Sequence, residues 1–241
     1  MKMIVITGWG LGTHVLTPFT ALLKAAGHEV ELWDIFDPFD SDILLEKLNQ
    51  AEKSELLIGW SLGGQLALYL AYTLQTRRQI MLPVICCMSN PCFVAQQEWP
   101  HAMPQRQYQN FATLIDSNTL KGIHRFCHLV SMGSSAPLKR AKTLQSYLSK
   151  IDLNYQKDHL YLLEQLDLRK ILHRLSSNML FLIGNKDQLV PCKVSNILGT
   201  FEDDRLNIEI LEASHDSILF EPELIIASIL HFLENALLTL K

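Results

Sequence analysis

The pentapeptide Gly59-Trp60-Ser61-Leu62-Gly63 is the segment of the sequence that points most directly to chemistry. An apolar run typical of a strand leads into it, and a run rich in Ala and Leu, which favours a helix, leads out. On such a turn the glycines let the backbone close while the serine hydroxyl stands clear of the sheet. The pattern predicts that Ser61 is a nucleophile. The alternative, a serine that only caps a helix, leaves the flanking glycines unexplained.

A serine hydroxyl needs a base to take its proton, and the base needs a carboxylate to orient it. On this kind of turn the chain order is serine, acid, histidine. Asp187 follows an apolar segment at 178–183, and His215 follows another at 206–211. We therefore predict that Asp187 is the acid and His215 the base. Asp216 is adjacent to His215, but adjacency gives no reason to expect contact with the imidazole ring.

Acyl transfer also needs N–H donors for the oxyanion, each commonly worth a few kcal/mol of barrier. The residue after the nucleophile, Leu62, supplies one backbone N–H. The loop Gly8-Trp9-Gly10 follows the first apolar run, and its flexible glycines would let the Trp9 amide turn into the site. An ordinary turn is the alternative for this loop.

Strand-like and helix-like segments alternate along most of the chain. This order predicts a parallel sheet covered on both faces, with its sites at the carboxyl ends of the strands. The predicted strands are 3–7, 29–34, 55–60, 80–88, 178–183 and 206–211, and the predicted helices between or after them are 14–26, 41–51, 62–74, 191–198 and 222–238.

One long interruption separates the fourth strand from the fifth, and its apolar spacing is helical. Its predicted helices are 105–115, 119–130, 137–149 and 156–166. A chain of 241 residues suits one core with an insertion better than two equal domains. Together with the alternation of strands and helices and the turn at Ser61, this predicts an α/β-hydrolase fold. Its core would be 1–92 with 173–241, and 93–172 would form a helical cap.

The composition narrows the class of protein. Hydrophobic residues make up 48% of the chain, the net charge is −4 and the pI is about 6.1, which argues against a nucleic-acid binder. The first apolar run is too short for a signal peptide or a membrane span. We expect a cytoplasmic monomer. Neither metal-ligand spacing nor a phosphate-binding glycine loop is evident, so no metal and no cofactor are predicted.

Together these motifs resemble the pimeloyl-acyl-carrier-protein methyl ester esterases of biotin biosynthesis, over most of the chain. The resemblance implies hydrolysis of a methyl ester on a carrier-bound pimeloyl chain, with release of methanol and with Ser61, Asp187 and His215 as the triad. The P-C-F and E-W-P motifs are the most specific. The shared motifs are G-W-G-L at 8–11, G-W-S-L-G-G at 59–64, S-N-P-C-F at 89–93, E-W-P at 98–100, R-F at 125–126, M-G at 132–133, D-L-R at 167–169 and G-x-x-D-x-L-V-P at 184–191.

The resemblance also implies that residues 126–130 lie along the acyl chain. For Cys127 and His128, plain packing is the alternative. The five residues of this stretch are Phe126, Cys127, His128, Leu129 and Val130.

A basic face on the cap would suit an acidic acyl carrier protein. Lys121 and Arg125 are spaced i, i+4 on one predicted helix, and Lys139, Arg140 and Lys142 begin the next. A solvated charged surface is the alternative. The resemblance favours docking, with Arg125 as its best single member.

Two other functions remain open. A general short-chain carboxylesterase or thioesterase would use the same triad. A catalytically silent relative that binds a ligand is disfavoured, because such a protein would be expected to lack at least one of Ser61, Asp187 and His215.

Overall fold

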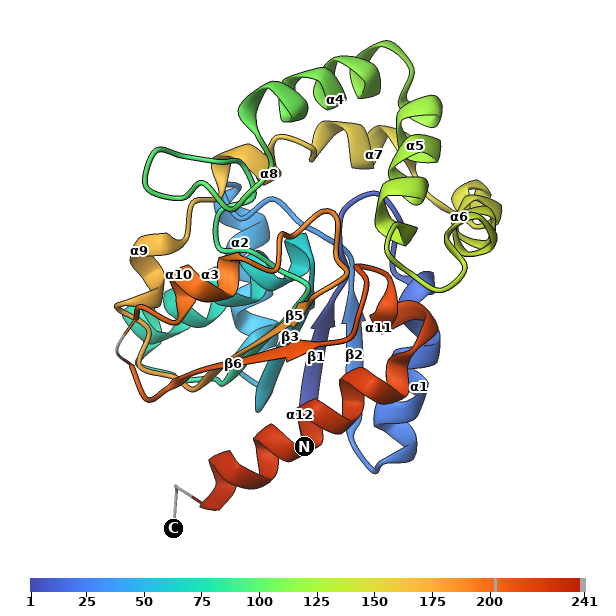
Figure 1. Ribbon diagram of the computed structural model, residues 1–241. Coiled ribbons are helices and arrows are strands. Elements are labelled where there is room, and N and C mark those ends of the chain that lie inside the picture. The colour runs from blue at the N-terminus through green and yellow to red at the C-terminus, as the bar shows by residue number, and fades with distance from the viewer. Residues whose placement is uncertain (202, 239–241) are drawn as a thin grey trace.

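The computed structural model describes residues 1–201 and 203–238 (Figure 1). Six strands in this part of the chain form one parallel sheet in the order β2-β1-β3-β4-β5-β6, which confirms the predicted α/β-hydrolase fold. The strands are β1 (Lys2–Ile6), β2 (Glu29–Trp33), β3 (Leu56–Trp60), β4 (Val84–Cys87), β5 (Met179–Gly184) and β6 (Leu206–Leu211).

Helices cover both faces of the sheet. α1 packs against α12 on one face, whereas α2 and α3 pack together on the other (Figure 1). Every residue of β3, β4 and β5 is buried, as expected for strands covered on both sides. The bounds are α1 (Thr17–Ala25), α2 (Ser41–Ala51), α3 (Leu62–Arg78), α10 (Val194–Leu198), α11 (Ser217–Phe220) and α12 (Pro222–Leu238), with a 3-10 turn η1 (His14–Leu16) before α1.

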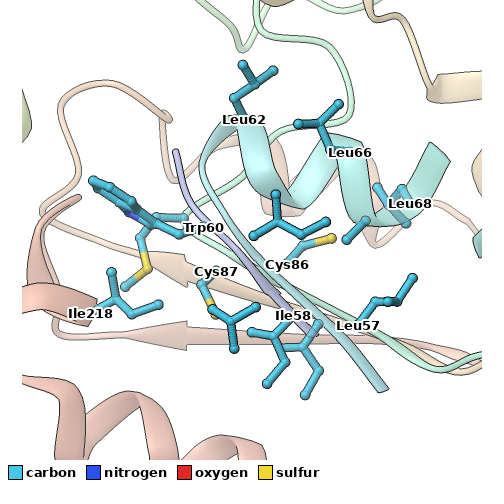
Figure 2. Packing of buried hydrophobic residues seen from close by; sticks show 14 of the residues in the cluster. Leu57, Ile58, Trp60, Leu62, Leu66, Leu68, Cys86, Cys87 and Ile218 are labelled. Atoms are coloured by element: carbon cyan, nitrogen blue, oxygen red, sulfur yellow. The ribbon is translucent and has the colours of Figure 1, made fainter. Parts of the chain in front are cut away.

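Side chains from β3, β4 and α3 form the centre of the core (Figure 2). Leu57 and Ile58 are neighbours on β3 and point to opposite faces of the sheet, as alternation along a strand requires. Cys86 and Cys87 of β4 are fully buried, and burial raises the pKa of both thiols. These two cysteines therefore serve as small apolar core residues.

The segment between β4 and β5 is helical, and most of it lies over the carboxyl ends of the strands (Figure 1). We call this layer the cap; the boundaries 93 and 172 stay a prediction. Its last helix, α9, contacts α3 of the core. The bounds are α4 (Gln105–Ser117), α5 (Thr119–Ser131), α6 (Pro137–Ser146), the 3-10 turn η2 (Leu148–Lys150), α7 (Leu153–Asp158), α8 (Leu162–Gln165) and α9 (Arg169–Leu172).

The prediction of one helix at 156–166 is wrong. The chain instead forms α7, which begins after Asp152, and then α8 after a turn at 159–161. The Asp152 carboxylate accepts hydrogen bonds from the backbone N–H groups of Asn154 and Tyr155, which fixes the start of α7. Buried leucines run through the turn at Leu160 and into α8 at Leu162 and Leu163, so apolar periodicity could not reveal the break.

Three other predicted elements are shorter than expected, and one of them is the helix at 191–198, which is reduced to α10. The strand at 80–88 is reduced to β4, which begins directly after Pro83, and proline cannot donate to a sheet ladder. The helix at 137–149 ends at Ser146, and η2 follows. Among the described residues, no helix combines the length and apolar character needed to cross a bilayer.

At Gly63, helix α3 lies close against β1. A Cβ atom added there would collide with the carbonyl oxygen of Ile6. We expect Gly63→Ala to lower the free energy of unfolding by about 1–3 kcal/mol or more, because the backbones must separate. Urea denaturation followed by circular dichroism measures this change.

Gly199→Ala is the matched control, since its added Cβ would lie 3.2 Å from the carbonyl oxygen of Ser195 and its backbone is right-handed helical. Its unfolding midpoint should stay close to that of the wild type. Equal midpoints for the two variants would contradict the interpretation of Gly63.

Candidate active site

Ser61 occupies the sharp turn between β3 and α3. Its φ of 55° and ψ of −123° are rare for a residue other than glycine. A Cβ on Gly59 would collide with the Gly63 carbonyl, so the turn needs glycine at these positions. The Ser61 backbone is held by Cys87, whose carbonyl accepts from its N–H at 2.9 Å, and by Ser89, whose hydroxyl donates to its carbonyl at 2.7 Å. Ser61 makes no side-chain capping bond to α3, which argues against the helix-cap alternative.

Asp187 and His215 meet at the carboxyl ends of β5 and β6. Asp187 Oδ2 accepts a hydrogen bond from His215 Nδ1 at 2.7 Å, and both side chains are buried. The other carboxylate oxygen, Oδ1, accepts from the backbone N–H groups of Leu189 and Val190 at 2.8 and 2.9 Å. The indole N–H of Trp60 donates to the His215 carbonyl at 3.0 Å. Both members of the pair are therefore held by backbone contacts.

The second ring nitrogen of His215 is free to act. Nε2 is buried and has no hydrogen-bond partner among the described residues. The His215 ring lies 5.6 Å, centroid to centroid, from the ring of Trp60, the residue before Ser61. Ser61 and His215 are not joined by a hydrogen bond in the structure; in enzymes without substrate this bond is often long.

The Gly8-Trp9-Gly10 loop lies against the nucleophile. A Cβ on Gly8 would lie 3.0 Å from Ser61 Cβ, and Gly10 has a φ of +89°, a value that favours glycine. Leu62 is the first residue of α3, and the first N–H groups of a helix have no partner within it. The segments that carry the two predicted oxyanion donors are thus neighbours of Ser61.

Gln156 of α7 holds this loop from the cap, which the sequence did not indicate. Its side-chain Oε1 accepts from Gly10 N at 2.7 Å, and its backbone carbonyl accepts from Trp9 Nε1 at 2.6 Å. Its side chain is almost fully buried. A glutamine within a helical pattern is usually solvated, so no sequence signal separates this one from the rest.

An apolar cavity of about 360 Å³ lies between α4, α5 and the Asp187 loop. Phe111, Phe126, Leu129, Leu163 and Leu189 contribute apolar lining. The Trp9 ring contacts the rings of Phe111 and Phe126 edge-on, at centroid distances of 5.5 and 5.1 Å. The cavity therefore lies beside the Gly8-Trp9-Gly10 loop.

Only part of the predicted acyl-chain stretch faces this cavity. Phe126 and Leu129 line it, whereas Cys127, His128 and Val130 do not. Cys127 is buried, which raises the pKa of its thiol to about 12, and the exposed His128 ring contacts Gln145. Five consecutive helical residues point around the whole helix, so they cannot all face one cavity.

The predicted docking cations separate into two groups. Lys121, Arg125, Lys139 and Lys142 are exposed. Arg140 is buried instead, where its guanidinium contacts the carboxylates of Asp216 and Glu221 at 3.2 and 2.8 Å. The prediction for Arg140 needs correction, because this cation is buried and paired with two carboxylates inside the protein.

The chain is similar to known proteins in both sequence and structure. Residues 16–222 match the family described as alpha/beta hydrolase fold. A pimeloyl-[acyl-carrier protein] methyl ester esterase from Shewanella woodyi is 30% identical over 231 residues, which cover 90% of this chain and 88% of that protein. A protein of the same name from Xylella fastidiosa is 30% identical over 202 residues, 78% of this chain and 77% of its own.

Solved structures agree on the fold. A bromoperoxidase from Bacillus anthracis superposes with a TM-score of 0.81 at 17% identity, over 97% of this chain and 91% of its own. An esterase from Exiguobacterium antarcticum superposes with a TM-score of 0.80 at 15% identity, over 97% and 92%. The chain belongs to the α/β-hydrolase fold family and, within it, to the family of pimeloyl-[acyl-carrier protein] methyl ester esterases.

Proposed function

We propose that the protein is a serine esterase that hydrolyses the methyl ester of pimeloyl-[acyl-carrier protein] to methanol and pimeloyl-[acyl-carrier protein]. The observation that carries the chemistry is the 2.7 Å hydrogen bond between Asp187 and His215, which leaves Nε2 of His215 free near the Ser61 turn. The names of the two relatives support the substrate. A cytoplasmic monomer remains part of the proposal.

Each member of the triad has its own role in the proposed reaction. Ser61 Oγ attacks the ester carbonyl carbon while His215 Nε2 accepts the hydroxyl proton, and Asp187 stabilises the resulting imidazolium. The tetrahedral intermediate breaks its bond to the methoxy group, and His215 returns the proton to form methanol. A water molecule then attacks the acyl-enzyme, again with His215 as base, and releases the free carboxylate and Ser61.

The backbone N–H groups of Leu62 and Trp9 stabilise the oxyanion in this proposal. Such donors act strongly only if they are fixed before the reaction. α3 fixes Leu62. Gln156 fixes the loop of Trp9, because it bonds both the indole of Trp9 and the next backbone N–H, that of Gly10.

In this proposal the cavity binds the pimeloyl chain of the substrate, and the exposed cations bind its carrier protein. The aromatic and leucine side chains of the cavity suit the methylene groups of the pimeloyl chain. Arg125 lines this cavity and is also exposed on α5, close to Lys121 on the same helix face. Lys139 and Lys142 add exposed positive charge on α6. An acidic carrier protein would find complementary charge on these two helices.

Replacement of the nucleophile tests the proposal directly. We expect Ser61→Ala to lower kcat on pimeloyl-[acyl-carrier protein] methyl ester by roughly 10⁴- to 10⁶-fold, because no other group can form the acyl-enzyme. Methanol release and the mass of the carrier protein measure the reaction, and circular dichroism checks the fold. Near-normal turnover by Ser61→Ala would exclude the mechanism, and cleavage of a small aryl ester alone by the wild type would exclude the substrate.

The loop contact is tested with Gln156→Met. We expect kcat on a small aryl ester to fall about tenfold to a hundredfold, somewhat less than for outright loss of an oxyanion donor, because the Trp9 amide is displaced rather than removed. Gln145→Met on α6 is the control, since among the described residues the side-chain hydrogen bonds of Gln145 go to His124 and His128 of the cap. If both variants keep wild-type kcat, Gln156 has no part in fixing the loop.

Charge reversal tests the carrier contact. Arg125→Glu should raise KM for the carrier-bound ester by about tenfold, equivalent to ~1.4 kcal/mol, and the effect should shrink at high salt through screening. The exposed Arg77 at the end of α3 allows the same charge change away from the cap, so Arg77→Glu should leave KM unchanged. Equal losses on the carrier-bound ester and on a small ester would instead assign Arg125 a structural role.

A further inference from the structure

The corner between α5 and α6, residues 131–140, contacts the loops of both Asp187 and His215. At Gly133 the φ is +87°, and an added Cβ would collide with the carbonyl oxygen of Lys186, the residue before Asp187. At the other end of the corner, Arg140 reaches Asp216, the residue after His215. This corner of the cap therefore packs closely against the backbone of the Asp187 loop, and it forms an ion pair with the His215 loop.

Arg140 is enclosed by acceptors from the core and the cap. Nη1 lies 3.2 Å from Asp216 Oδ1, and Nη2 lies 2.8 Å from Glu221 Oε1 and 3.2 Å from Ser135 Oγ. The guanidinium also lies over the Phe220 ring, 5.1 Å from its centroid. Only 10% of the Arg140 side chain is exposed. The planar, five-donor group of arginine suits such a set of partners.

The network continues on both sides of His215. The Ser214 hydroxyl donates to Asp216 Oδ1 at 2.6 Å, so the residues before and after His215 are joined. Ser217 accepts from Ser214 N at 2.9 Å and donates to Glu221 Oε2 at 2.7 Å. The backbone on either side of the base is thus linked to the two carboxylates that Arg140 holds.

The Arg140 cation stabilises the ionised form of the buried Asp216 carboxylate. Its side chain is fully buried, and its Oδ2 has no hydrogen-bond partner among the described residues. Burial raises the pKa of the Asp216 carboxyl, whereas the Ser214 hydroxyl and the Arg140 charge act in the opposite direction. Buried ion pairs contribute little net stability, and in some proteins they instead select one geometry over others. The geometry selected here is that of the loop around His215.

We propose that Arg140 is a positioning residue: through Asp216 and Glu221 it fixes the His215 loop from the cap, so that Nε2 stays in place to accept the Ser61 proton. The inference rests on the proposed roles of Ser61 and His215 and not on the identity of the carrier-bound substrate. Arg140 lies on α6 of the cap, whereas Asp216 and Glu221 flank α11 of the core, 76 and 81 residues away in the chain.

The test uses a small aryl ester, with kcat expressed per active serine after titration with a fluorophosphonate. We expect Arg140→Met to lower kcat at least about tenfold with KM within about twofold, because a displaced base slows chemistry more than binding. Arg140→Lys should recover much of the loss, since it restores a cation. Arg205→Met is the control, because Arg205 pairs with Asp203 at the start of β6, far from the site.

Loss of Arg140 leaves two carboxylates without their cation and could prevent folding. The triple variant Arg140→Met, Asp216→Asn, Glu221→Gln removes all three charges. It leaves no buried carboxylate without a cation, so we expect it to fold even if Arg140→Met does not. Its kcat per active serine should stay low, because the cap contact is still missing. Wild-type kcat per active serine in either folded variant would overturn the proposal. Activity on the aryl ester but not on the carrier-bound ester would reject the proposed substrate alone.

Discussion

The close packing of β1, β3 and α3 is the constraint on which the rest of the site depends. Gly59 and Gly63 let the helix start directly above the strand, and Ser61 is forced into a backbone conformation that few residues adopt. Such a conformation is retained only where the surrounding structure over-determines it. Here the surrounding structure is the buried centre of the sheet, so the stability of the core and the backbone conformation of the nucleophile have one origin.

The cap contributes to the catalytic geometry as well as to the pocket. Gln156 holds the loop of Trp9 on one side of the nucleophile, and Arg140 holds the loop of His215 on another. Both side chains are polar and buried, and each bonds to core atoms far away in the sequence. A buried polar network that is well satisfied specifies one arrangement, because any other leaves groups unpaired. These contacts tie the cap to the core at two separate places.

Helix α6 has two chemically different faces. Lys139 and Lys142 are exposed to solvent, whereas Arg140 between them points inward to the carboxylates. The 3.6-residue period of a helix makes this separation unavoidable for neighbouring residues. The same period divides α5, where Phe126 and Leu129 face the cavity and His128 faces outward. Exposed and inward-facing side chains therefore alternate along each helix.

Three features could be predicted from the sequence: the α/β fold, the turn at Ser61, and the pairing of Asp187 with His215. The turn depends on adjacent residues, and parallel strands bring their carboxyl ends to one edge whatever the details of packing. Tertiary structure alone decided the burial of Arg140, the role of Gln156, the break between α7 and α8 and the residues that face the cavity. Those features depend on contacts such as Gly10 to Gln156, 146 residues apart, and a local pattern carries no information about a partner at that separation.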